Sequence, residues 1–403
     1  MTTISVHIGS GSGQVSEGGV TLPATSWVDP KRRWWLLGLV VPILPLAAAG
    51  LVAGTGLSVF WWLGPAMLYG VMPILDLTLG RDGENPPEEA VAELNDDRYY
   101  RWCTYLFLPL QFTSLIVACS IWARGDLSVW SALGLAATVG SVGGVAINTA
   151  HELGHKHPLV EQWLAKVALS QTGYGHFFIE HNRGHHVNVS TPDDPASSRL
   201  GQSLYEFLPR TVAGSVRSAF RIERDRRRRA GDRFVSVRND VLNAWALSVV
   251  LFGSLIAVFG FGIVPWLVVQ ACIGFLMLEV VNYVEHYGLL RARNEKGRYE
   301  RCRPEHSWNA NNVASNLALY QLQRHSDHHA NPTRRYQSLR HFEDVPQLPT
   351  GYAGMMALAL VPPLWRKVMD QRVLDFYAGD ITRANLHPRR RRQLLARYGQ
   401  PAS

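Results

Sequence analysis

Long apolar runs alternate with polar segments along the chain, and this pattern predicts a membrane protein. Length alone would allow two or three soluble domains, but the distribution of apolar residues overrides that expectation. Six nearly uncharged runs each approach or exceed the ~20 residues that a helix needs to cross a bilayer. They cover residues 34–54, 57–80, 102–123, 128–150, 242–260 and 263–285. We therefore predict an all-α integral membrane protein with six transmembrane helices.

The remaining segments indicate how the chain is organised around these spans. Residues 1–30 are rich in Gly, Ser and Thr and lack the basic-then-apolar pattern of a signal peptide, so we expect a flexible tail. Residues 31–380 form a single membrane domain, in which the polar segments make a helical cap over the bundle. Residues 381–403 are predicted to be a basic C-terminal tail. The four cysteines form no C-x-x-C pair and indicate no disulfide framework.

The distribution of basic residues predicts the orientation in the membrane. Of the 40 Lys and Arg residues, only Arg124 falls in the short loops that join spans one to two, three to four and five to six. The positive-inside rule then places both termini and the cap on the cytoplasmic side. The basic runs at 224–233 and 389–392 could indicate nucleic acid, but in a membrane protein we expect them to face anionic lipid headgroups. An acidic protein partner is the functional alternative.

Histidine clusters supply the candidate chemistry. HELGH at 151–155, an H-x3-H-H group at 181–186 and HSDHH at 325–329 are joined by the isolated His286. Residues i and i+4 share one face of a helix, so His151 with His155, and His181 with His185, could each hold one ion. His186 points about 100° away from His185 and could serve a second ion. His325, His328 and His329 are expected to share a face. Nine imidazoles exceed what one ion needs, so we predict a two-metal site.

Other features of the spans agree with a site at their inner ends. Asn148, His151 and His155 form one polar stripe at the end of the fourth span, and Glu279, Asn282 and His286 repeat it on the sixth. Ionisable groups at membrane depth usually face a site or a cavity. Gly140 and Gly144 have the small-xxx-small spacing of close helix packing.

Two other functions compete for the same histidines. HELGH matches the H-E-x-x-H pattern of zinc proteases, in which Glu152 would be the general base. A zinc hydrolase needs about three protein ligands, which leaves six clustered histidines unexplained. A metal transporter is the other alternative, but transport sites usually lie at the bilayer midplane. These histidines are predicted to lie at its inner edge.

HELGH, EHNRGHH, NYVEHYGL and LQRHSDHH, with TPDDPASSR and HANPTRRYQSLR after two of them, closely resemble the membrane-bound, rubredoxin-dependent alkane 1-monooxygenases. The resemblance covers about residues 31–380. The three histidine boxes alone would also fit desaturases, sterol oxidases and xylene-type hydroxylases, and a desaturase on the same scaffold is the second interpretation. The resemblance implies that two iron ions are bound by His151, His155, His181, His185, His186, His286, His325, His328 and His329.

The same resemblance implies the reaction and its partners. Dioxygen would hydroxylate the terminal carbon of a medium-to-long-chain linear alkane. Electrons would come from a separate rubredoxin with its NADH-dependent reductase, at the inner membrane of a bacterial cell. Acids beside the ligands are candidates to orient imidazole N–H groups, namely Glu152, Asp194, Glu285 and Asp327. On the second span we predict Leu68 and Met72 as substrate-channel residues and Leu75 as a packing residue.

Overall fold

The computed structural model describes residues 27–399, and this part of the chain is helical. Within it, the backbone forms isolated bridges but no β-strand. Six helical segments are long and apolar enough to cross a membrane, which confirms the six predicted spans and makes this a multi-pass membrane protein. Most of the predicted flexible tail, residues 1–26, lies outside the described residues.

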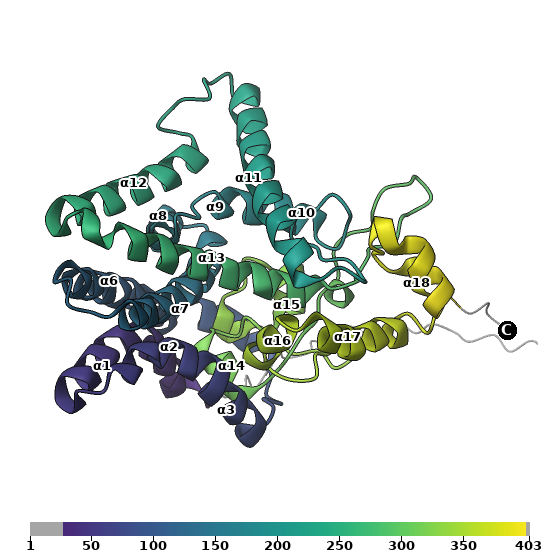
Figure 1. The fold of residues 1–403 in the computed structure, drawn as a ribbon. Helices are drawn as coiled ribbons and strands as arrows, with labels where there is room; N and C mark the ends of the chain where they lie inside the picture. Colours follow the sequence, from purple (N-terminus) through teal and green to yellow (C-terminus); the bar gives the residue numbers. More distant parts are fainter. Residues whose placement is uncertain (1–26, 400–403) are drawn as a thin grey trace, which may run out of the picture.

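The spans form a bundle of parallel and antiparallel helices (Figure 1), and some of them combine several helical elements. In chain order these elements are η1 and α1 (Arg32–Leu39, Val40–Thr55); η2, α2, η3 and α3 (Ser58–Trp62, Leu63–Ala66, Met67–Val71, Met72–Leu79); α5 and α6 (Arg98–Tyr105, Phe107–Ala123); α7 (Val129–Gly154); α12 (Asp240–Phe259); and η7 with α13 (Phe261–Ile263, Val264–His286).

The fourth span, α7, forms the centre of the bundle because small residues let its neighbours approach. Of its most apolar window 89% is buried, against 50% or less in each other span. A Cβ atom on Gly140 would lie 2.7 Å from Cβ of Ile273, and one on Gly144 would lie 2.6 Å from Cε of Met277. The predicted packing role of this glycine pair is therefore confirmed, and α7 and α13 run side by side to the site.

The cap covers one end of the bundle and, apart from α11, is made of shorter helices (Figure 1). It comprises η4 and α4 (Glu88–Ala90, Val91–Asp96), α9 (Phe177–Glu180), η6 (His181–His185), α10 (His186–Asn188), α11 (Leu204–Arg229), η8 (Pro304–His306), α14 (Val313–Ala318), α15 (His325–Ala330), η9 (Tyr336–Ser338), α16 (Tyr352–Ala359), α17 (Pro362–Phe376), η10 (Ile381–Arg383), η11 (Pro388–Arg390) and α18 (Arg391–Tyr398). Unlike these cap elements, α8 (Leu159–Leu169) and η5 (Ser170–Thr172) turn back along α7 into the bundle, where Gln171 Nε2 donates to Val139 O (3.3 Å).

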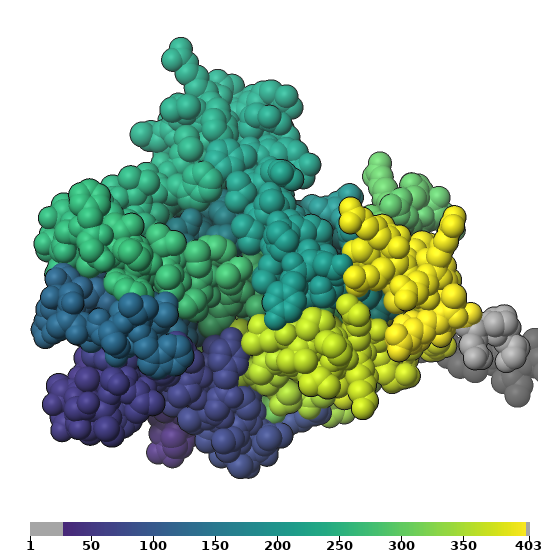
Figure 2. Space-filling model, viewed as in Figure 1, coloured from purple at the N-terminus to yellow at the C-terminus, as the bar shows by residue number. Residues whose placement is uncertain are grey.

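The longest cap helix, α11, lies across the ends of two spans. Near its start Phe207 packs on Tyr283, with ring centroids 5.4 Å apart. Near its end Arg226 binds Asp240 at 3.0 Å. Tyr283 is close to the end of α13, and Asp240 begins its antiparallel neighbour α12, so both contacts lie on the same membrane side. α11 therefore runs along that surface, and its far end with the following loop projects from the body (Figure 2).

The C-terminal segment differs from the prediction of a basic tail. Between Ile381 and Tyr398 the chain is packed on the cap: Leu200 N–H donates to Asn385 O (2.8 Å) and His387 N–H donates to Leu200 O (3.0 Å). Leu394 of α18 is buried. Apolar residues spaced among the arginines supply this anchorage, so residues 381–399 belong to the folded cap.

Candidate metal centre

Nine histidines converge where α7 and α13 leave the bundle. They are the nine that the sequence predicts as metal ligands, contributed by the ends of these two spans and by cap elements η6, α10 and α15. They form two groups, within each of which one ring nitrogen of every residue lies within 4.8 Å of the others. The first group is His151, His155, His181, His186 and His328, and the second is His185, His286, His325 and His329.

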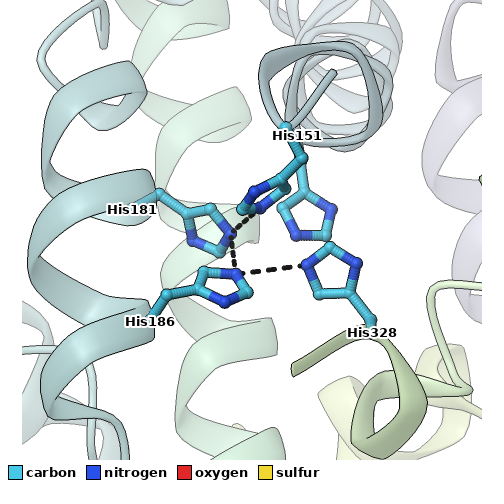
Figure 3. Close-up of side chains that lie close together, drawn as sticks. His151, His181, His186 and His328 are labelled. Atoms are coloured by element: carbon cyan, nitrogen blue, oxygen red, sulfur yellow. Dashed lines mark hydrogen bonds between the residues drawn. The ribbon is translucent and has the colours of Figure 1, made fainter. Parts of the chain in front are cut away.

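In the first group the Nε2 atoms point toward one another (Figure 3). The Nε2 atom of His181 lies 3.1 Å from that of His155 and 3.0 Å from that of His186. The Nε2 atom of His186 lies 3.2 Å from that of His328. His151 Nε2 is buried and has no hydrogen-bond partner. Five imidazoles from four elements, α7, η6, α10 and α15, thus direct nitrogen atoms into one small space.

The second group adjoins the first on the side of α13. Its closest pair is His325 and His329, whose Nε2 atoms are 2.9 Å apart. His185 Nε2 and both ring nitrogens of His286 are buried without a hydrogen-bond partner. The rings of His186 and His329, one from each group, have centroids 4.3 Å apart. The two groups therefore lie side by side, with imidazole rings of one group in contact with rings of the other.

The chemistry of these donors fits metal ions. Buried polar atoms in proteins are nearly always hydrogen-bonded, so several unpaired nitrogens directed inward are typical of lone pairs held for a cation. Burial lowers the pKa of the cap imidazoles well below the usual value, and neighbouring histidines lower it further. The affected residues are His155, His181, His186, His325, His328 and His329. Neutral imidazole is the form that binds a metal.

The grouping of His181, His185 and His186 differs from the expected pairing. We expected His181 and His185 to hold one ion and His186 a second, but His181 and His186 share the first group and His185 belongs to the other. The cause is a π-turn, η6, in which the N–H of His186 donates to the carbonyl of His181. Such i→i+5 turns are frequent at functional sites. The turn brings Nε2 of the fifth residue, and not that of the fourth, close to Nε2 of His181.

The three histidines of α15 also divide between the groups. His328 joins the first, whereas His325 and His329 join the second. At about 100° per residue His328 and His329 point in different directions, so a helix that lies between the groups supplies both. Arg324, just before α15, fixes this helix with bonds to Asp82 Oδ2 (3.0 Å) and Leu339 O (2.7 Å).

Asp194 has the position expected of an acid that orients a ligand. Its Oδ2 atom lies 2.9 Å from Nδ1 of His185. Ser197 Oγ donates to the same oxygen (2.6 Å), and the backbone N–H of Ala196 donates to Oδ1 (3.0 Å). Burial opposes ionisation of Asp194, but His185 and Ser197 outweigh it and lower the pKa of the carboxyl group. A proton held on Nδ1 leaves Nε2 of His185 free to bind a metal.

The other three acids make different contacts from those expected. Glu285 Oε2 lies 3.2 Å from His325 Nε2, the atom that faces His329, so this carboxylate borders the metal-facing side of the ring. Glu152 pairs with Lys156 (3.1 Å). Asp327 accepts hydrogen bonds from the Arg340 backbone (2.9 Å) and the Asn331 side chain (2.8 Å).

The contacts of Glu152 also bear on the zinc-protease alternative. A general base needs a carboxylate that reaches a metal-bound water. Glu152 instead bonds to Lys156 and accepts the Tyr336 N–H (3.2 Å), which fixes the loop after α15. This geometry does not favour hydrolysis.

An apolar cavity of about 250 Å³ leads from the bundle to the histidines. Leu68 and Met72 line it, as do His151, His181 and His325 at its inner end. The cavity therefore joins the predicted channel residues to both histidine groups. Its apolar lining, with histidines among the lining residues, suits an apolar molecule with one end at the site.

Two features of the cavity wall were missed. Leu75 lines the cavity, so its assignment as a packing residue was wrong. Its helix face continues that of Leu68 and Met72, which is the signal that could have found it. Leu44 of α1 and Met356 of α16 also contribute. Their sequences are apolar all round, so no periodic pattern distinguishes a cavity-facing residue from a lipid-facing one.

The family comparisons agree with this geometry. A family model described as fatty acid desaturase matches residues 128–359, which include all nine histidines. The chain therefore belongs to this class of histidine-rich membrane proteins. Within it, the chain is 46% identical over 378 residues to alkane 1-monooxygenase of Acinetobacter baylyi, covering 92% of each chain. It is 45% identical over 377 residues to alkane 1-monooxygenase 1 of Alcanivorax borkumensis, covering 94% of this chain and 93% of the relative. The chain is a member of the alkane 1-monooxygenase family.

Proposed function

We propose that this protein hydroxylates the terminal carbon of medium-to-long-chain linear alkanes with dioxygen, at a centre of two iron ions. One observation carries the proposal: an apolar cavity ends on two adjoining groups of imidazoles. The names of the relatives, alkane 1-monooxygenases, support the same substrate and reaction. An enzyme that acts on a water-soluble substrate would not need an apolar cavity between membrane helices.

Each histidine group would hold one iron ion. Imidazole suits iron, whereas a metal without redox chemistry, such as zinc, cannot oxidise an unactivated C–H bond. When bound, the iron ions supply the activation of dioxygen, by which an alkane, dioxygen, two electrons and two protons give a primary alcohol and water. Asp194 fixes the orientation of His185 for this role, and the π-turn fixes the directions of His181 and His186.

The cavity walls determine which carbon reacts. Terminal C–H bonds are stronger than internal ones, so selectivity has to come from the way in which the chain is held. Apolar side chains along the cavity exclude water, and a linear alkane would lie lengthwise between the helices with one end toward the histidines. Its leading methyl group then meets His151, His181 and His325 first.

Oxygen labelling separates this function from desaturation. We expect purified enzyme with a linear alkane and ¹⁸O₂ to release a primary alcohol that carries the label. A desaturase on the same scaffold would release an alkene without label. An unlabelled alkene as the main product would falsify hydroxylation, and a labelled secondary alcohol would contradict terminal selectivity.

We further propose a location in the bacterial inner membrane, with both termini and the cap in the cytoplasm. The basic residues concentrate on the cap side of the spans, which supports this orientation. The electron donor would be rubredoxin, reduced by an NADH-dependent reductase, and its docking site would be a basic surface of the cap.

The structure refines which arginines form that surface. The run at 226–229 is not one patch, because two of its members turn inward. Arg226 bonds to Glu223 (2.6 Å) and Asp240 (3.0 Å), and Arg227 is buried and pairs with Asp232. These two arginines tie α11 to α12 and to its own following loop, so they are unavailable to a partner.

A different set of arginines makes an exposed stripe on α11. Positions i, i+4, i+7 and i+11 share one helix face. Earlier on this face Glu206 pairs with Arg390 (2.8 Å), so the face is turned toward the C-terminal part of the cap and away from the spans. An acidic protein from the cytoplasm fits this stripe better than lipid headgroups do. The stripe consists of Arg217, Arg221, Arg224 and Arg228.

Charge reversal of the stripe tests the docking site. We expect the four arginines changed together to glutamate to raise KM for an acidic carrier about 10-fold at low salt, because electrostatic steering is lost. The wild-type rate should fall as salt shortens the Debye length to ~8 Å, and the variant should be insensitive to salt. A chemical reductant should support both enzymes equally. Matched reversal at Arg391 and Arg392 of α18 is the control, and an equal effect there would contradict a specific stripe.

A further inference from the structure

Several buried carboxylates around the histidine groups have no basic partner. Some buried acids of the described chain are paired with basic side chains, for example Glu152 with Lys156 (3.1 Å) and Glu161 with Arg335 (2.9 Å), whereas Asp29, Asp76 and Asp370 are held by uncharged donors. Within residues 27–399, likewise, no Lys or Arg side chain forms an ion pair with four acids near the site. These acids are Glu180, Asp194, Glu279 and Glu285, all fully or almost fully buried. Buried charges are normally paired or coordinate metals.

Glu279 stands apart from the other three, because it is not next to a histidine in sequence and forms no hydrogen bond with one. It lies in α13, 1% exposed, and three side chains donate to it. Tyr174 Oη donates to Oε1 (2.7 Å), Thr211 Oγ1 donates to Oε2 (2.7 Å), and Asn282 Nδ2 donates to Oε2 (3.2 Å). A carboxylate accepts all three bonds, and these donors offset part of the cost of burying its charge.

No basic side chain neutralises that charge directly. Arg210 precedes Thr211 on α11, but its guanidinium donates to Ser197 O (2.8 Å). In the direction of the site, Glu279 lies two helical turns, about 10 Å, before His286 on the same stripe of α13. Asn282, which binds Glu279, also lines the cavity.

We propose that Glu279 is a buried anion whose counter-charge is the metal centre, and that it acts as a positioning residue that strengthens metal binding. The inference rests on the proposed two-iron function. Nine neutral imidazoles bring no charge to two divalent ions, so carboxylates near the site have to balance them. A charge that does not bind the metal still attracts it in a medium of low dielectric constant. Glu279 lies within the span α13, so a charge inside the membrane helps to hold the metal ions at the end of that span.

The matched substitution is Glu279→Gln, which keeps the shape and removes the charge. Loss of an interaction behind the ligands typically costs 10–100-fold in metal affinity. We expect Fe(II) affinity, measured by competition with a chelator, to fall by about 10- to 100-fold. The melting temperature of the metal-free variant should equal or exceed that of metal-free wild type, because an unbalanced buried charge has gone. Its increase on Fe(II) addition should shrink. Glu279→Asp, which keeps the charge, should bind Fe(II) more tightly than Glu279→Gln.

Asp29→Asn is the control for removal of a buried acid. Asp29 also accepts three bonds, from Trp35 Nε1 (2.8 Å), Tyr100 Oη (2.9 Å) and the Lys31 N–H (2.9 Å), and none of its donors belongs to a histidine group. Its Fe(II) affinity should match wild type. Thr211→Val removes one donor from Glu279 and provides a second test if Glu279→Gln does not fold, with a smaller loss of affinity expected.

The outcomes separate this inference from the proposed function. Wild-type affinity in Glu279→Gln, or lower stability of the metal-free variant with unchanged affinity, would overturn the positioning role and leave the two-iron proposal intact. Wild-type protein that binds no Fe(II) would overturn the proposed function itself.

Discussion

Alanine in place of His286 is expected to abolish alkane oxidation and to lower the iron content of the purified protein. His286 is the last residue of α13, it is buried, and both of its ring nitrogens lack a hydrogen-bond partner. The truncation removes one of four imidazoles in the second group. Loss of a direct ligand should exceed the 10–100-fold cost of losing a residue behind the ligands, so activity should drop by more than about 100-fold. Iron analysis and product formation are the two measurements.

The same substitution at His157 and at His387 provides the controls. Neither residue belongs to a histidine group, and His157 is exposed. Both variants should retain wild-type iron content and activity. A fully active His286→Ala enzyme would be incompatible with nine ligands. Equal iron loss in all three variants would mean that the effect comes from general destabilisation.

The fold and the candidate ligands could be predicted because each depends on a local pattern. An apolar run of about 20 residues has few alternatives to a membrane span, and the ends of all six runs agree with the structure to within a few residues. Three histidine clusters and one isolated histidine are all predicted at the same end of the spans, so they are expected to lie close together in space. The nine residues were therefore predictable together.

The division of the histidines into two groups could not be predicted, because it depends on backbone geometry that the sequence does not encode simply. In an ideal α-helix His181 would share a face with His185, which is why we expected these two to bind one ion. In the structure the π-turn puts His181 in one group with His186. The contacts of the acids depend on loops distant in sequence. Glu152 reaches Tyr336, and Asp327 reaches Arg340. Of the four acids, only Asp194 bonds to an imidazole nitrogen that faces away from the other histidines, that of His185, nine residues away.

Basic runs are a further case in which sequence proximity misleads. Arg226 and Arg227 are neighbours of Arg228 in sequence, but a helix turns successive residues by about 100°. Arg228 is 78% exposed at its side chain, whereas that of Arg227 is 5% exposed. The exposed stripe is spread over three turns of α11, so its arginines are not consecutive in the sequence.

The last prediction concerns the length of alkane that the cavity accepts. Leu68 lies in η3 and lines the cavity, eleven residues before the end of α3 at Leu79. At ~1.5 Å per residue this separation is about 16 Å along the helix. Met72 and Leu75 line the wall between these points. An alkane with its end at the histidines therefore has its tail near Leu68 only if the chain is long.

Tryptophan at position 68 should act as a stopper. Leucine leaves the cavity open, and the larger indole would fill part of a space of only about 250 Å³. We expect Leu68→Trp to keep near-wild-type kcat/KM on the shorter alkanes and to lose at least about 10-fold on the longest, because a blocked tail prevents the leading methyl group from reaching the site. A series of linear alkanes of increasing length, assayed one by one, measures this cut-off.

Leu77→Trp is the matched control, because Leu77 lies on the same helix with 75% of its surface exposed and does not line the cavity. It should leave the length profile unchanged. A uniform loss at every chain length in Leu68→Trp would show that Leu68 serves helix packing and not the substrate. A cut-off in Leu68→Trp with none in Leu77→Trp would instead place the alkane tail between α1, α3 and α7, because the cavity lies between these helices.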